Sequence, residues 1–138
     1  MYSARCYCGA ARLSFTRPPP TVAYCHCNDC RRWTGAPVAG FAAFTADDVV
    51  GREGFHPNPP KTPGVQRFNC QNCGSPLMAT FDYLPGQVYV PLGICDQAAE
   101  FEPQIHCHSD KALPWLHIND GLPRKDGSAR ETLTSENR

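Results

Sequence analysis

Seven of the nine cysteines in the chain fall into three short clusters whose spacing is typical of metal ligands. The clusters are Cys6-Tyr7-Cys8-Gly9, Cys25-His26-Cys27-Asn28-Asp29-Cys30 and Cys70-Gln71-Asn72-Cys73-Gly74. Residues two apart on a strand point to the same face, so we expect Cys6 and Cys8 to reach one ion together. A Cys-x-x-Cys-Gly sequence predicts a turn that brings two sulfurs together, with the glycine relieving the backbone. Since thiolates are preferred ligands of protein zinc, the clusters predict zinc, two ions per chain.

The number of ligands divides these cysteines into a closed site and an open one. Four sulfurs complete a tetrahedral structural zinc site, and the predicted set is Cys6, Cys8, Cys70 and Cys73. Three ligands leave one position for an outside molecule, as in catalytic zinc sites, and this second set is Cys25, Cys27 and Cys30. Alternatively, a histidine closes the second site, and both zinc ions are structural. The histidines available for that role are His26, His56, His106, His108 and His117.

The two remaining cysteines, Cys95 and Cys107, stand outside the clusters. Isolated cysteines are more often buried core thiols than ligands, so a core position is favoured for both. The sequence His106-Cys107-His108 looks like a ligand sequence. On a strand, however, its two histidines would share one face without a partner cluster.

Three residues that directly follow Cys30 are candidates for binding a substrate: Arg31, Arg32 and Trp33. Three thiolates on one zinc leave a net charge of about minus one. The two arginines would offset this charge or grip a substrate carboxylate, and an exposed basic pair is the alternative. Trp33 would form a pocket wall or, more commonly, pack in the core. Asp29 is expected to cap the turn rather than act as a base, so no catalytic residue is assigned beyond the second zinc site.

The composition of the chain argues against some classes of function. The chain has 138 residues, enough for one domain, and its 13 basic residues balance its 13 acidic ones. Nucleic-acid-binding domains usually carry a basic surplus, so no nucleic-acid partner is expected. The first residues lack a secretory pattern and no apolar run would span a bilayer, which predicts a cytoplasmic protein with no membrane partner. In a reducing compartment the cysteines favour metal over disulfides.

Short strands are predicted by the apolar patterns and by 14 prolines, which disfavour long helices. The expected strands are residues 13–15, 21–24, 38–44, 65–69, 77–81, 88–90, 105–108 and 115–118. A single helical turn is expected over residues 29–33, and a long surface loop over residues 51–64. These elements predict one mainly β domain over residues 1–124, followed by a flexible polar tail over residues 125–138.

The ordered set of motifs resembles the family of glutathione-dependent formaldehyde-activating enzymes, which includes the centromere protein V proteins. The resemblance rests on the three cysteine clusters and on the following further segments: Arg31-Arg32, Gly35-Ala36-Pro37, Arg67-Phe68, Ser75-Pro76-Leu77, Val88-Tyr89-Val90, Gly93, His106, residues 111–115 and Asp120-Gly121-Leu122-Pro123. It implies small antiparallel sheets in a β-tent arrangement and structural zinc at the four-cysteine set. It also implies a second zinc at the three-cysteine set.

For function, the resemblance implies a carbon–sulfur lyase that handles thiol adducts, forming S-hydroxymethylglutathione from glutathione and formaldehyde. A small-molecule thiol such as glutathione is therefore the expected partner, and assembly into a homo-oligomer is left open. The alternatives are a non-enzymatic zinc-binding module or thiol carrier, and a redox sensor that releases zinc when Cys25, Cys27 and Cys30 are oxidised. An exchangeable fourth ligand on the second zinc would distinguish the enzyme from a purely structural protein.

Overall fold

The computed structural model describes residues 1–128, which form short strands, one α-helix and four 3-10 helices. The strands are β1 (Tyr2–Arg5), β2 (Arg12–Phe15), β3 (Thr21–Cys25), β4 (Ala39–Thr45), β5 (Val49–Glu53), β6 (Phe55–Pro57), β7 (Val65–Cys70), β8 (Pro76–Phe81), β9 (Gln87–Pro91) and β10 (Ile105–Cys107). The α-helix is α1 (Asn28–Thr34), and the 3-10 helices are Ala46–Asp48, Leu92–Ile94, Ala98–Glu100 and Ser109–Lys111. The mainly β fold predicted from the sequence is confirmed.

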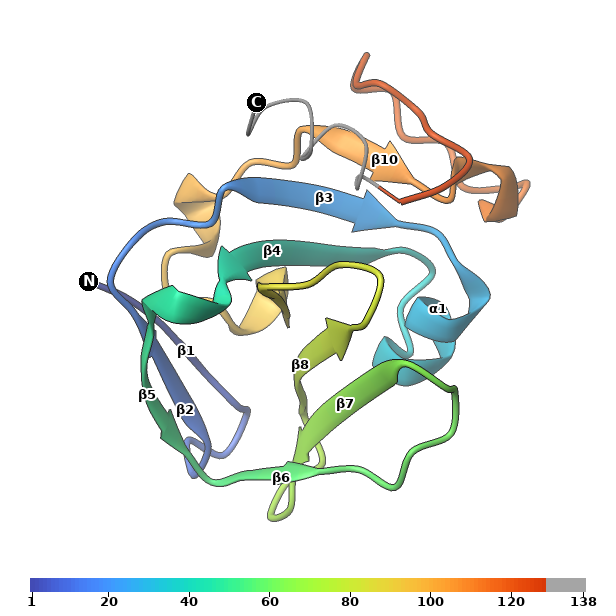
Figure 1. The fold of residues 1–138 in the computed structure, drawn as a ribbon. Helices are drawn as coiled ribbons and strands as arrows, with labels where there is room; N and C mark the ends of the chain where they lie inside the picture. Colours follow the sequence, from blue (N-terminus) through green and yellow to red (C-terminus); the bar gives the residue numbers. More distant parts are fainter. Residues whose placement is uncertain (129–138) are drawn as a thin grey trace.

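The strands form two sheets (Figure 1). The smaller sheet has the order β1-β2-β5 and is antiparallel. The larger sheet has the order β10-β3-β4-β9-β8-β7-β6. Its neighbours are antiparallel except β10 and β3, which run parallel, so the expected antiparallel pairing needs correction at this edge. The parallel pairing places Cys107 directly beside Cys25.

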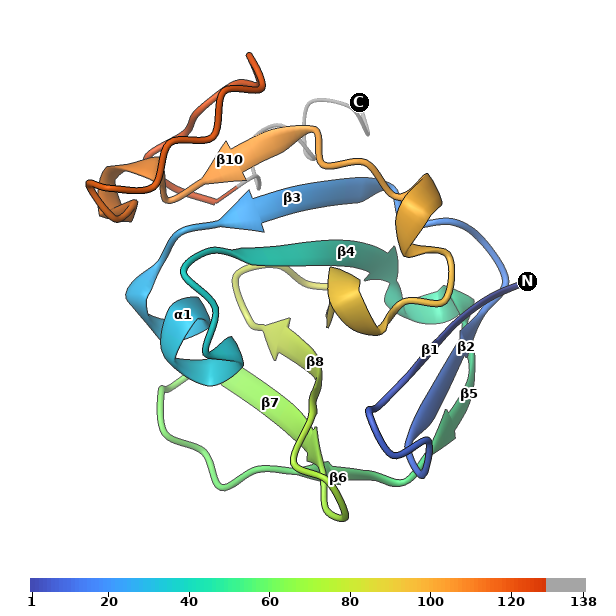
Figure 2. The ribbon, with the colours of Figure 1, turned by 180° about the vertical axis from the view of Figure 1, so that it is seen from behind.

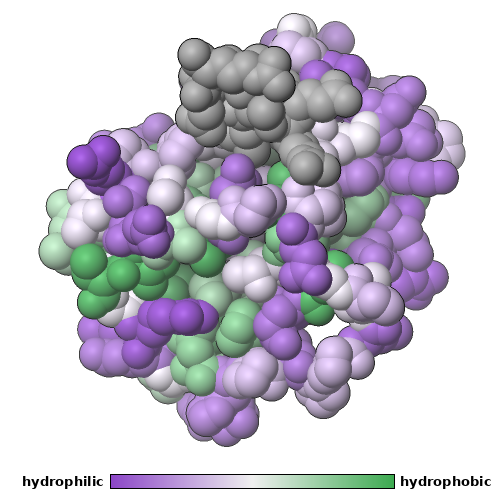
Figure 3. Space-filling view, in the orientation of Figure 1, coloured by the Kyte–Doolittle hydropathy of each residue, from purple (hydrophilic) through white to green (hydrophobic). Residues whose placement is uncertain are grey.

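The main hydrophobic core lies between the two sheets. Leu13 and Phe15 from the smaller sheet pack with Phe44 and Val90 from the larger one, and all four side chains are buried. The rings of Phe15 and Phe44 stack with centroids 3.6 Å apart. Because the interior takes up these apolar side chains, the face of the molecule in Figure 3 is largely hydrophilic, with hydrophobic residues visible between polar ones.

The region expected to be a long loop, residues 51–64, contains two strands. β5 pairs with β2 in the smaller sheet and β6 pairs with β7 in the larger one. Gly54, whose φ is +72°, bends the chain between them, so one segment serves both sheets. Neither strand has apolar alternation, because both are largely exposed and are held by pairing with a neighbour.

The remaining differences from the expected elements lie near the ends of the described residues. β1, which occupies four of the five residues before Cys6, was not predicted. Residues 115–118 form no strand, and Trp115 is exposed. The predicted tail begins at residue 125, but hydrogen bonds from His108 N–H to Gly127 O and from Ser109 N–H to Lys125 O hold the start of that segment. Residues 129–138 of the predicted tail lie outside the described residues.

Candidate metal centres and the adjoining cavity

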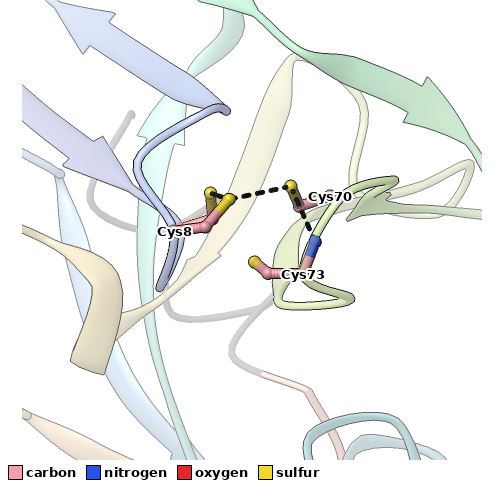
Figure 4. A group of neighbouring side chains, drawn as sticks. Cys8, Cys70 and Cys73 are labelled. Carbon is pink, nitrogen blue, oxygen red and sulfur yellow. Dashed lines mark hydrogen bonds between the residues drawn. The ribbon is translucent and has the colours of Figure 1, made fainter.

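The four cysteines predicted to form a closed site lie together, with all sulfur atoms within 4.8 Å of one another. The Sγ atom of Cys8 is 3.6 Å from that of Cys6 and 3.8 Å from that of Cys70. Figure 4 shows Cys8, Cys70 and Cys73 converging from two separate turns. Metal–sulfur bonds of about 2.3 Å in a tetrahedron place neighbouring sulfurs about 3.8 Å apart, so this group has the dimensions of a metal site.

Two tight turns position these sulfurs. Cys6 and Cys8 lie in a turn after β1 and not on a strand, which corrects the expected reason for their approach. Gly9 N–H donates to Cys6 O at 3.1 Å, and Gly74 N–H donates to Cys70 O at 2.8 Å. Both glycines have a φ of +80°, a conformation that side chains disfavour. The glycine that follows each cysteine pair therefore closes its turn.

Hydrogen-bond donors reach the sulfurs of this group and favour the thiolate form of Cys6 and Cys73. Ala11 N–H donates to the Sγ of Cys6 at 3.2 Å, and the side-chain amide of Asn72 donates to the Sγ of Cys8 at 3.2 Å. The Ser75 hydroxyl and backbone lower the pKa of Cys73 to about 5. Burial raises the pKa of Cys6, but the bond from Ala11 N–H and neighbouring thiols outweigh it and leave the pKa below its usual value. Thiolates are the form that binds a metal.

The three cysteines predicted to form an open site also lie together, with their sulfurs within 4.8 Å of one another. Cys25 ends β3, Cys27 caps the N-terminus of α1, and Cys30 is buried in the first turn of that helix. The Sγ atoms of Cys25 and Cys30 are 3.3 Å apart, and Cys30 N–H donates to the Sγ of Cys27 at 3.2 Å. The junction between a strand and a helix thus gathers three sulfurs within six residues.

These three thiols oppose one another's ionisation. Hydrogen bonds from Cys25 and Cys30 lower the pKa of Cys27 to about 2, while the bond with Cys27 strongly raises the pKa of Cys25. For Cys30 the bond with Cys25 lowers the pKa, but Cys27 and burial raise it to about 12. One thiolate therefore forms readily and the others resist ionisation. A bound cation would remove this repulsion, so the group suits a metal.

Histidine does not complete either group within residues 1–128. His26 lies between two cysteines of the open group, but its ring turns toward His106. His56 and His117 are exposed, and His108 lines the cavity described below. In the part of the chain that the structure describes, two separate cysteine groups can therefore hold metal ions, one with four sulfurs and one with three.

A chain of hydrogen-bonded polar side chains begins at the buried His26, between two cysteines of the three-sulfur group, and ends at the exposed Asp120 and Arg124. The Nε2 of His26 lies 2.8 Å from the Nδ1 of His106, and the Nε2 of His106 lies 2.7 Å from Oδ2 of Asp120. Asp120 also accepts a bond of 2.8 Å from Arg124. Because a carboxylate only accepts, His106 donates to Asp120 and, in its neutral form, accepts from His26. These hydrogen bonds tie residues 120–124 to the segment between Cys25 and Cys27.

A cavity of about 520 Å³ lies against the three-sulfur group, and Cys25, Cys27 and Cys30 all form part of its wall. Aromatic side chains form much of the remaining wall: Phe41, Phe81, Tyr83 and Tyr89. Among the described residues, none of the four cysteines of the other group lines this cavity. A molecule of small-ligand size can therefore lie in this cavity against the three-sulfur group. The cavity does not extend to the four-sulfur group, of which Cys8 is exposed at the surface.

The predicted substrate-binding residues take three different positions. Trp33 packs its ring against Phe41, with centroids 6.2 Å apart, and lines a smaller recess beside the cavity. Arg32 is exposed and lines the same recess. Arg31 lines neither space, and its Nε is buried without a hydrogen-bond partner among the described residues. The sequence therefore placed two of its three candidates near the cavity and none in its wall.

Arg67 lines both the cavity and the recess, and sequence reasoning gave it no role. Its guanidinium lies over the Trp33 ring, 4.8 Å from the centroid. Its positive charge acts on Cys30, lowering the pKa of that thiol against the opposing effect of the other cysteines. The available signal was its place directly before Phe68-Asn69-Cys70, within the strand that leads into the Cys70–Cys73 turn.

The two isolated cysteines are buried, as the sequence favoured. Cys95 packs in the main core, where burial raises its pKa to about 12. Cys107 packs with Ala23 and Ile105 and also lines the cavity beside His108. Neither belongs to a metal-ligating group of the described residues.

The fold and the two sulfur groups together define a small, mainly β domain with two cysteine groups that could hold metal ions, one of them in the wall of a cavity. A family model for the glutathione-dependent formaldehyde-activating enzyme matches residues 1–111, and the chain belongs to this family. Among residues 1–128 there is no helix long and apolar enough to cross a membrane.

Two further proteins are similar to this chain. An uncharacterized lyase of Schizosaccharomyces pombe is 29% identical over 86 residues, which cover 62% of this chain and 61% of the relative. The match thus spans about three fifths of that relative's length. A crystal structure of a Rhodobacter sphaeroides protein superimposes with a TM-score of 0.54 at 19% identity, covering 89% of this chain and 99% of the other. This second likeness supports the fold.

Proposed function

We propose that the chain is a zinc-dependent enzyme of carbon–sulfur lyase type that acts on adducts between a thiol and an aldehyde. The observation that carries the proposal is the position of the three-sulfur group in the wall of a cavity, with no histidine of residues 1–128 completing it. A site with three protein ligands and access from outside is the form that zinc takes in catalysis. Membership of the family and the lyase name of the yeast relative support the reaction class.

In this proposal the two groups have different tasks. The structural zinc is held by the four-sulfur group: Cys6, Cys8, Cys70 and Cys73. The second zinc is held by Cys25, Cys27 and Cys30, with the fourth position left for substrate. A zinc ion there would favour the ionised form of a bound thiol and polarise an aldehyde oxygen. Arg67 places a positive charge near the three sulfurs and offsets part of their negative charge.

The reaction itself is redox-neutral. In the forward direction the thiol sulfur bonds to the carbonyl carbon, and the thiol proton passes to the carbonyl oxygen. In the reverse direction the carbon–sulfur bond breaks and the hydroxyl proton returns to sulfur. The family name supports glutathione as the thiol and formaldehyde as the aldehyde, with S-hydroxymethylglutathione as the adduct.

The proposed setting is the cytoplasm, where glutathione is abundant and thiols stay reduced. The equal numbers of acidic and basic residues support a small-molecule partner rather than a nucleic acid. Phe41 and Phe81 offer apolar surface in the cavity wall, which can cover the uncharged part of a substrate.

The proposal is tested on purified protein by metal analysis, X-ray absorption and exchange kinetics. We expect two zinc equivalents, an average sulfur coordination below four, and a change at the metal edge when glutathione is added. We also expect faster exchange between glutathione, formaldehyde and their adduct by NMR, lost in Cys27→Ser. Binding of glutathione without faster exchange would identify a thiol carrier instead. Four sulfurs at both zinc ions, unchanged by thiol, would contradict both functions.

A further inference from the structure

The recess beside the cavity differs from it in charge. The recess has a volume of about 260 Å³, and three cationic side chains line it: Arg32, Lys61 and Arg67. Arg67 also belongs to the cavity wall, together with Thr62 and Val65, so the two spaces are neighbours. Arg67 therefore stands in the wall shared by the cavity at the three-sulfur group and the cationic recess.

The guanidinium of Arg67 is held in place without using all of its donors. It lies between two aromatic rings, 4.8 Å from the Trp33 centroid and 5.9 Å from that of Phe81. Its Nη1 is buried and has no hydrogen-bond partner among the described residues. Arg67 also forms no salt bridge within residues 1–128. An unpaired buried donor is costly, and a planar guanidinium matches a carboxylate with two parallel hydrogen bonds.

Trp33 holds the guanidinium of Arg67 in a fixed position. Its Nε1 donates to Oδ1 of Asn69 at 2.8 Å, which sets the ring on which Arg67 stacks. Stacking fixes the plane of the guanidinium and lowers the entropy lost when it binds a ligand. The cation is therefore preorganised beside the cavity before any ligand enters.

Acidic residues also border these spaces, and they limit the ligand. Asp29 lines both the cavity and the recess, and Asp82 lines the cavity. A ligand with negative charge spread over its whole length would be repelled by these carboxylates. A ligand carboxylate that lies at Arg67 would instead form an ion pair with the guanidinium. The arrangement favours a thiol with discrete, separated carboxylates.

We propose that Arg67 binds a carboxylate of the thiol substrate, so that the enzyme selects thiols carrying carboxylates remote from the sulfur over small neutral thiols. The inference rests on the proposed function, since it assumes that the substrate sulfur lies at the three-sulfur group. Arg67 is then a specificity-determining residue, and the recess with Arg32 and Lys61 receives the far end of the same molecule.

The test measures binding by calorimetry to the full, zinc-loaded chain at fixed pH and ionic strength. The probes are glutathione, its diethyl ester and 2-mercaptoethanol. With the unmodified protein we expect the affinity for the diester to be lower than that for glutathione by a factor of about ten or more. With Arg67→Met we expect glutathione to bind about ten- to a hundredfold more weakly, while the diester and 2-mercaptoethanol, which lose only the effect of the Arg67 charge on the sulfurs, weaken much less. Arg67→Lys should recover part of the loss, because it keeps the charge but not the paired donors.

Arg52 provides a matched control. It also lies over two aromatic rings, 5.7 Å from the Phe55 centroid and 5.4 Å from that of Phe68, but it lines neither space. Arg52→Met should leave all three affinities unchanged. If Arg67→Met does not fold, two measurements still test whether Arg67 binds a carboxylate. They are the comparison of glutathione with its diester on the unmodified protein and the affinity of Arg67→Lys for glutathione.

Equal binding of glutathione and its diester would overturn this inference and leave the proposed function intact. An equal loss of glutathione and 2-mercaptoethanol binding in Arg67→Met would also overturn it, since Arg67 would then act on the sulfur group and not on a carboxylate. Absence of binding for all three thiols to the unmodified protein would overturn the proposed function together with this inference.

Discussion

The indole Nε1 of Trp33 donates to Oδ1 of Asn69 at 2.8 Å, and this bond joins the two cysteine groups. Asn69 directly precedes Cys70, and its side-chain amide donates to Gly74 O at 2.9 Å within the first cysteine turn. Trp33 belongs to α1, the helix that carries Cys30 (Figure 2). The turn of the four-sulfur group therefore positions the helix of the three-sulfur group.

Trp33→Phe should weaken this connection while keeping an aromatic ring under Arg67. We expect the free energy of unfolding to fall by about 1 kcal/mol, the usual contribution of one hydrogen bond. The affinity of the three-sulfur group for zinc should fall as well, because α1 loses an anchor. Denaturant unfolding and competition with a chelator measure the two effects. Unchanged affinity of the second zinc would show that the helix is positioned without Asn69.

Cysteine substitutions should separate the two metal groups. Cys70→Ser removes a buried sulfur from the four-sulfur group, and structural zinc typically contributes on the order of 10 kcal/mol to folding. We expect little soluble, folded protein from this variant. Cys27→Ser should instead fold and retain one zinc equivalent. Circular dichroism and metal analysis compare the variants, and equal tolerance of both changes would contradict the proposed division.

Asp120 should stabilise the fold through its charge. Burial raises the pKa of this carboxyl, but hydrogen bonds from His106, Leu122 N–H and Arg124 outweigh it and hold the pKa well below its usual range. A lowered folded-state pKa means that the stabilisation is present above the unfolded-state pKa of about 4 and is lost as the pH falls below it. Asp120→Asn should therefore lower the denaturation midpoint equally across pH 5–8.

Below about pH 4 the difference between Asp120→Asn and the unmodified protein should shrink, because the unfolded chain then takes up a proton at Asp120 that the folded protein does not. Asp110→Asn is the control, because Asp110 is exposed and its one ion pair in the described residues, with Lys111, is 3.8 Å long. It should change the midpoint little at any pH. A difference that instead disappears between pH 8 and 6 would mean that a histidine, not the carboxylate, controls the effect.

Gly54 should resist substitution more than Gly93. Gly54 has a φ of +72°, and an added Cβ would lie 2.7 Å from the backbone oxygen of Ala10. Gly93 has no such φ and no heavy atom within 4 Å of an added Cβ. Gly54→Ala should therefore lower the free energy of unfolding by about 1–3 kcal/mol, and Gly93→Ala by less than about 0.5 kcal/mol. Thermal unfolding measures both, and similar effects would be evidence against a strained junction between β5 and β6.

Much of the candidate site was predictable because metal ligation restricts residue type and spacing. Each cysteine turn is local, so a cysteine pair with its trailing glycine indicates two sulfurs that meet. The strands with apolar runs, such as β4 and β9, were predictable for a related reason, since burial between the sheets requires continuous apolar side chains. β5 and β6 escaped prediction because edge strands with exposed side chains carry no such pattern.

The sequence by itself determined the three local cysteine clusters, because their chemistry depends on spacing over a few residues. The fold brings Cys6 and Cys8 together with Cys70 and Cys73, as the prediction of a four-sulfur group required. Only the tertiary structure decided that the three-sulfur group lines a cavity and that Arg67, from a different strand, stands beside it. It also decided that the ring of His26 turns toward His106, to which it is hydrogen-bonded. These relationships join residues far apart in the chain, so they depend on how the sheets pack and leave no local pattern in the sequence.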